Sequence, residues 1–199
     1  MKKLALAIVA IAISFVGYSQ DFSFGVKASA NFSQIDGDAY TGYNKIAFNF
    51  GILTEYPFSD RFSGQLEIGY TGKGARDNGD NTTIVSLGYV EIPILLHFVA
   101  TEKLDIGIGV VPSILVTHKT TENGSDNTNL INQTNGYNRF ELPYAIDARF
   151  WFNPHFGINA RFTYSLLNIR EEKVSGSRKG LLSTGQFNNV LSAGFIWRM

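Results

Sequence analysis

Apolar and polar residues alternate along most of the chain after residue 21. In residues 22–34, apolar residues such as Phe24, Val26 and Phe32 occupy even-numbered positions, and polar residues such as Lys27 and Asn31 occupy odd-numbered positions. Successive side chains of a β-strand point to opposite faces, so this pattern predicts a long strand with one apolar and one polar face.

The same alternation recurs in seven further segments. They are residues 45–56, 61–73, 86–99, 104–117, 139–152, 156–167 and 187–199. In residues 104–117 the period puts Ser113 and Thr117 on the polar face and Ile114 and Val116 on the apolar face. A tilted strand needs roughly 9–11 residues to cross a bilayer, and every segment reaches that length.

The connections between these segments alternate between short and long. Residues 57–60, 100–103 and 153–155 are tight turns, whereas 35–44, 74–85, 118–138 and 168–186 are longer and polar. Membrane barrels place short turns in the periplasm and long loops outside the cell. The sequence therefore predicts an all-β fold, an eight-stranded antiparallel up-and-down transmembrane β-barrel with both chain ends on the periplasmic side.

Alternation alone does not decide which face meets water, since a soluble lipocalin-like calyx alternates too. The polar face here is rich in Gly, Ser, Thr and Asn, and aromatic residues gather towards both ends of the segments, as in the two belts of a membrane barrel. The final segment carries Phe195, Trp197 and Met199 on its apolar face and resembles the signal read by the outer-membrane insertion machinery. These features favour the cell outer membrane, with lipid and that machinery as partners. A soluble calyx binding an apolar ligand is the alternative.

The first twenty residues have the layout of a secretory signal peptide. Lys2 and Lys3 precede an apolar run from Leu4 to Val16, which is too short for a stable membrane span, and a small-x-small pattern follows at residues 17–19. We therefore expect residues 1–20 to be removed and residues 21–199 to form the barrel domain.

Composition supports an exported membrane protein and excludes several functions. Only 17% of residues are charged, against about 25% in soluble domains. The formal net charge is zero, so no nucleic-acid partner is implied. The absence of cysteine excludes disulfides, thiolate metal sites and a cysteine nucleophile.

Charged residues of both signs recur on the polar face, which would line the lumen. They are Lys27, Lys45, Glu55, Glu67, Lys73, Glu91, Asp105, Glu141, Asp147, Arg149, Arg161 and Arg198. An eight-stranded barrel is barely wide enough for its own side chains, and unpaired buried charges are costly. We therefore expect a closed polar lumen filled by salt bridges; a conduction path or ligand site is the alternative.

No catalytic motif stands out. The three histidines are His97, His118 and His155, and neither a Gly-x-Ser-x-Gly nor a His-Glu-x-x-His motif is present. We expect no enzyme, no cofactor and no metal. Glu91 with Pro93, and Glu141 with Pro143, repeat an acidic-x-Pro pattern that indicates a local kink or a gap between strands.

Several segments resemble the PorT-like outer-membrane β-barrel family. They are residues 24–33 (FGVKASANFS), 55–62 (EYPFSDRF), 89–96 (YVEIPILL) and 101–104 (TEKL). The resemblance implies an eight-stranded outer-membrane barrel of Gram-negative bacteria, and one member of that family is tied to protein secretion. It implies no catalytic residue.

The sequence thus predicts a non-enzymatic barrel acting as a membrane scaffold, through its extracellular loops, or through periplasmic partners such as secretion-system proteins. The alternatives are a small transport or ligand-binding barrel and the soluble calyx.

Overall fold

The computed structural model describes residues 22–38, 40, 42–77, 82–128, 136–171 and 178–199. The expected signal peptide lies outside these ranges. Within them, no helix has the length and apolar character required to cross a membrane.

In the described residues, fourteen strands make up almost all of the regular structure. They are β1 (Ser23–Asp36), β2 (Lys45–Pro57), β3 (Phe62–Arg76), β4 (Thr83–Glu91), β5 (Ile94–Thr101), β6 (Leu104–Val110), β7 (Ser113–Glu122), β8 (Ser125–Asp126), β9 (Phe140–Glu141), β10 (Pro143–Trp151), β11 (Phe156–Ser165), β12 (Arg178–Lys179), β13 (Thr184–Gly185) and β14 (Phe187–Arg198).

The long strands form a closed antiparallel barrel of eight strands, as the sequence predicts. Three of the eight are interrupted: β4 continues as β5, β6 as β7, and β9 as β10. Glu91 pairs with Ser113 before one interruption, and Ile94 pairs with Val110 after it. The two interrupted strands therefore keep the same register across the interruption. Pairing of β14 with β1 closes the sheet.

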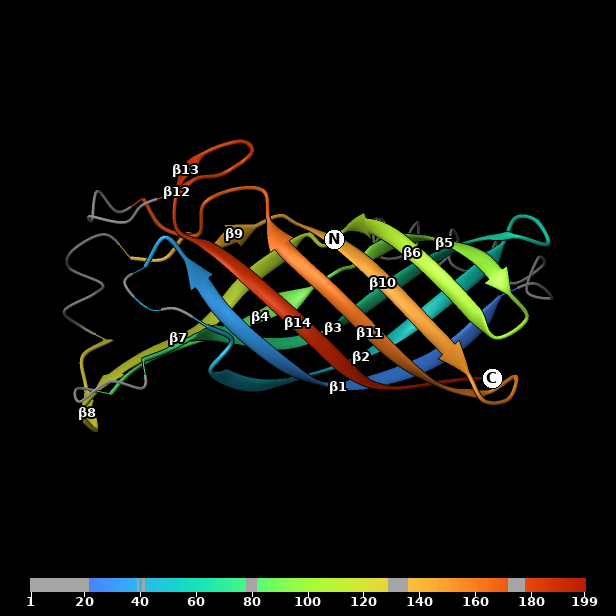
Figure 1. The fold of residues 1–199 in the computed structure, drawn as a ribbon, viewed down its shortest axis with the longest axis horizontal. Coiled ribbons are helices and arrows are strands. Elements are labelled where there is room, and N and C mark those ends of the chain that lie inside the picture. Colours follow the sequence, from blue (N-terminus) through green and yellow to red (C-terminus); the bar gives the residue numbers. More distant parts are fainter. Residues whose placement is uncertain (1–21, 39, 41, 78–81, 129–135, 172–177) are drawn as a thin grey trace, which may run out of the picture.

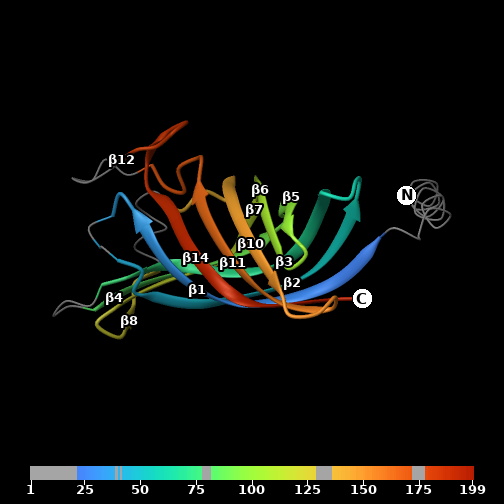
Figure 2. The same ribbon diagram turned by 45° about the vertical axis from the view of Figure 1, so that its right-hand side comes forward.

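The two ends of the barrel differ. The tight turns and the C-terminus lie together at one end, and the longer connections lie at the other (Figures 1 and 2). In a membrane barrel the tight-turn end is periplasmic and the long-loop end is extracellular.

Burial follows the alternation, with the apolar face outside. Outward side chains such as Phe48 are largely exposed (68%), whereas inward polar side chains such as Asn31 and Ser33 are fully buried. A polar interior and an apolar exterior suit lipid rather than water as the surroundings.

Three prolines cause the interruptions, and they lie on neighbouring strands. Glu67 N–H donates to Pro93 O (2.9 Å), Ile92 N–H to Pro112 O (2.9 Å), and Val111 N–H to Pro143 O (2.8 Å). Proline has no N–H, so each of these pairs lacks its second hydrogen bond. The remaining bonds hold the strands together, so the acidic-x-Pro pattern marks interruptions within paired strands and not an open gap.

Two sequence expectations are wrong at the extracellular end of β7. Gly88 pairs with Thr117 but Tyr89 pairs with Leu115, so Val116 forms a bulge and Thr117 is exposed, not on the inner face. A bulge adds one residue and reverses the alternation after it. In addition, the expected loop 118–138 begins as strand, because β7 runs to Glu122 and turns through Asn123 and Gly124 into β8.

Ser113 compensates for the hydrogen bond lost at Pro143. Its Oγ donates to Val111 O at 2.7 Å, and this carbonyl would otherwise accept from an N–H at position 143. We expect Ser113→Ala to lower the free energy of unfolding by about 1–3 kcal/mol, the cost of an unsatisfied buried acceptor. Urea titration in lipid vesicles measures this change.

The matched background for this experiment is Pro143→Ala, which supplies an N–H opposite Val111. In that background the effect of Ser113→Ala should shrink, and a double-mutant cycle measures the difference. Equal effects in both backgrounds would show that Ser113 does not act through Val111.

Candidate functional site

The interior of the barrel brings together eleven of the twelve charged residues that the sequence predicts for the lumen. The structure arranges them in three layers along the barrel. The periplasmic layer holds Glu55, Asp105, Arg149 and Arg198, the middle layer Lys27, Glu67, Asp147 and Arg161, and the outer layer Lys73, Glu91 and Glu141. Lys45, at the start of β2, is half-buried and lies apart from these layers.

Arg149 organises the periplasmic layer. Its guanidinium lies 2.8 Å from Glu55 and 3.0 Å from Asp105, and it donates to Gln65 Oε1 at 2.6 Å. Trp151 Nε1 donates to Asp105 at 2.7 Å, and the guanidinium of Arg198 lies 3.9 Å from the centroid of the Trp151 ring. Both carboxylates are therefore paired and hydrogen-bonded, which offsets the cost of their burial.

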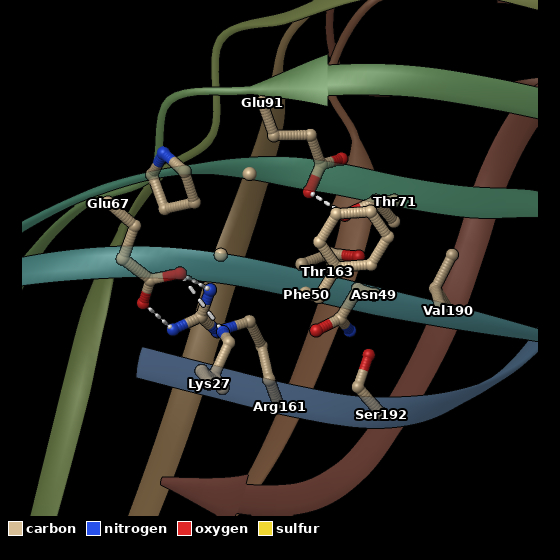
Figure 3. A pocket seen from close by; sticks show the side chains of 13 residues that line it. Lys27, Asn49, Phe50, Glu67, Thr71, Glu91, Arg161, Thr163, Val190 and Ser192 are labelled. Atoms are coloured by element: carbon tan, nitrogen blue, oxygen red, sulfur yellow. Dashed lines mark hydrogen bonds and ion pairs between the residues drawn. The ribbon is translucent and has the colours of Figure 1, made fainter. Parts of the chain in front are cut away.

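Arg161 organises the middle layer. It donates to Glu67 with two nitrogens, and Lys27 Nζ binds Glu67 at 3.0 Å (Figure 3). Its Nε donates to Asp147. Asn159 Nδ2 donates to Asp147 at 2.9 Å. A guanidinium offers several donors in a fixed plane, which suits it to bridging two carboxylates.

In the outer layer one cation serves two carboxylates. Lys73 Nζ lies 2.7 Å from Glu91 and 3.0 Å from Glu141. Neutral side chains give each carboxylate a further hydrogen bond. Thr71 Oγ1 donates to Glu91 at 2.7 Å, and Asn188 Nδ2 donates to Glu141 at 3.1 Å.

Little space is left between these side chains. A cavity of about 20 Å³ lies between the middle and outer layers, beside Lys27, Glu67, Glu91 and Arg161 (Figure 3). A water molecule needs roughly 10–15 Å³ by this measure, so the cavity has room for about one. The lumen at this level holds no small-molecule site.

An apolar cluster closes the extracellular end, and sequence reasoning missed it. Its buried members are Ile35, Ala75, Val85, Leu87, Tyr89 and Ile169, with Tyr40, Leu115 and Tyr137 packed against them. The sequence of residues 83–91 could have revealed this cluster. The odd-numbered side chains of this strand face the lumen, and Leu87 and Tyr89 among them are apolar.

The histidines form no recognisable reaction centre. His97 is buried in the lumen, and neither of its ring nitrogens has a hydrogen-bond partner among the described residues. His155 lies in a tight turn with Nδ1 3.0 Å from Arg198 O, and His118 packs near Tyr137. The part of the chain that the structure describes contains no group of three or more His, Asp or Glu arranged to hold a metal ion.

Comparison with known families identifies the barrel. The family model described as "Outer membrane protein beta-barrel domain" matches residues 18–171. The chain belongs to this family. Its location is therefore the outer membrane, and the soluble calyx is not favoured.

One solved structure supports the fold, and a second is similar to this chain. Neisserial surface protein A is 13% identical, with 88% of this chain and 97% of that chain covered and a TM-score of 0.55. Ail of Yersinia pestis is 14% identical, with 90% and 100% covered and a TM-score of 0.49. Among curated proteins, none matches this chain.

The ion pairs of the lumen give a prediction for stability. Arg149→Leu leaves Glu55 and Asp105 without their shared cation, so we expect the free energy of unfolding to fall by about 3–5 kcal/mol. Urea titration in lipid vesicles, followed by tryptophan fluorescence, measures the loss.

The control is Lys119→Met. Lys119 pairs with Asp126 at 3.8 Å on the exposed β7–β8 hairpin, where solvent screens the interaction and we expect no measurable change. If both variants were equally stable, the lumen pairs would not hold the barrel together.

Proposed function

We propose that this protein is a non-enzymatic, non-conducting outer-membrane barrel that acts through the surfaces at its two ends. The observation that carries the proposal is the filled lumen: three layers of ion pairs enclose a cavity of about 20 Å³. The apolar cluster of the extracellular end adds a further seal.

The size of the barrel supports the same conclusion. Eight strands leave an interior about wide enough for side chains, whereas porins with aqueous channels use about 16–18 strands. A transport or ligand-binding role would require the layers around Arg149, Arg161 and Lys73 to separate. Each of these cations bonds to carboxylates from more than one strand, which opposes such a movement.

Planar-bilayer recording tests the proposal. The purified, folded protein should produce no conductance steps under conditions in which a general-diffusion porin gives them, because no continuous water path crosses the three layers. Folding is checked first by the different gel migration of heated and unheated samples. Reproducible steps from the folded protein would favour the transport barrel instead.

A second candidate function is that of an accessory to protein secretion, as the resemblance to the PorT-like family implies. A hollow of about 490 Å³ at the periplasmic end favours it. Two of its carboxylates, Glu55 and Asp105, are already paired with arginines, whereas Asp60 and Glu102 are exposed in its lining. These two exposed carboxylates suit a basic segment of a periplasmic protein.

Photo-crosslinking in cells tests this candidate. A photoreactive residue at the exposed position of Glu102 should capture a periplasmic protein, and the same residue at Ser125, on the extracellular β7–β8 hairpin, should not. Identical adducts at both positions, or no adduct at Glu102, would count against a periplasmic partner at this hollow.

A further inference from the structure

The β12–β13 hairpin presents two leucines at its tip. Arg178 pairs with Gly185 and Lys179 with Thr184, and Gly180 N–H donates to Ser183 O at 2.8 Å. Leu181 and Leu182 therefore occupy the two central positions of a tight turn. They are 80% and 62% exposed, although they lie in an extracellular connection and not on a barrel strand.

The tip is held by contacts at the base of the hairpin. Asn168 N–H donates to Ser183 Oγ at 2.8 Å, and Asn168 Nδ2 donates to Thr184 O at 3.1 Å. Gly180 packs so closely on Phe187 that an added Cβ would overlap the ring. The two leucines are thus presented from a fixed position.

Phe187 shows on which side of the barrel wall the hairpin lies. By the alternation of β14 it lies on the same face as Leu191 and Phe195, which point outward. Its ring stacks on that of Tyr164, 6.0 Å away, yet it is 0% exposed. The hairpin therefore covers an outward-facing aromatic pair at the extracellular rim, where aromatic side chains mark the membrane–water interface.

The direction of the hairpin agrees with this placement. In both views β12 and β13 stand away to the side of the barrel and do not continue along the strands beyond its end (Figures 1 and 2). A loop that extends sideways from the outer rim lies over the surrounding lipid.

We propose that the Gly180–Ser183 turn is an interfacial anchor that places Leu181 and Leu182 in the outer leaflet of the surrounding membrane. Two exposed leucines lose unfavourable contact with water when they enter the acyl region. A lipid surface supplies the apolar surroundings that these two side chains lack at the tip of the turn.

The absence of cysteine permits a direct test. Leu182→Cys carries an environment-sensitive fluorophore, and the folded protein is placed in phosphatidylcholine–phosphatidylglycerol vesicles containing lipid with a nitroxide near the headgroup end of an acyl chain. The control is Ser125→Cys, on the exposed β7–β8 hairpin at the same end of the barrel. Heat-dependent gel migration verifies that each variant is folded.

The proposal predicts that the nitroxide lipid quenches the label at position 182 several-fold more than the label at 125. A water-soluble quencher should give the reverse order. If both labels respond equally to the water-soluble quencher and neither responds to the lipid, the turn faces water and the proposal is wrong.

A second variant separates the contribution of the leucines from mere proximity. Thr184 is exposed on the same hairpin, so a fluorophore on Thr184→Cys reports the position of the hairpin. The label is compared between the protein with both leucines and a variant that also carries Leu181→Ser and Leu182→Ser. Lipid quenching of this label should fall several-fold relative to the parent with both leucines. Unchanged quenching would show that the leucines do not anchor the hairpin.

Discussion

Inside lipid, every backbone N–H and C=O needs a partner within the protein, and this constraint explains most of the barrel. The pairing of β1 with β14 leaves the sheet without an edge. The three prolines do not fully meet this requirement, because each lacks the backbone N–H that would donate to a carbonyl of the neighbouring strand. At one of them the hydroxyl of Ser113 supplies the missing hydrogen bond, to Val111 O, so a side chain completes what the backbone lacks.

A second constraint follows from the first. Outward positions must be apolar, so the polar residues of each strand are forced into a narrow lumen, where charges are stable only in pairs. The periplasmic layer balances Glu55 and Asp105 against two arginines, and the middle layer balances Glu67 and Asp147 against Lys27 and Arg161. In the outer layer Lys73 pairs with two glutamates, and neutral donors such as Thr71 and Asn188 supplement it. The resulting plug leaves the two ends of the barrel as the surfaces available to partners.

The strands and the inward residues could be predicted because period-two alternation depends only on local sequence. The partners could not: Arg149 and Glu55 are 94 residues apart, and only the closed register brings them together. The bulge at Val116 was missed because one extra residue leaves no clear mark in an alternating pattern, so Thr117 was assigned to the wrong face. The apolar cluster around Tyr89 was missed because alternation was interpreted as polar inside throughout, although the inward residues of β4 contradict it.

The most direct test of a sealed lumen is the exchange of arginine side-chain hydrogens with water. Arg161 Nε–H donates to Asp147 inside the middle layer, whereas Arg61 is exposed in a tight turn. In the folded protein labelled with ¹⁵N-arginine and transferred to D₂O, the Nε–H signal of Arg161 should persist long after that of Arg61 has disappeared. Loss of both signals at the same rate would show that water passes freely through the lumen, and the account of a closed barrel would be wrong.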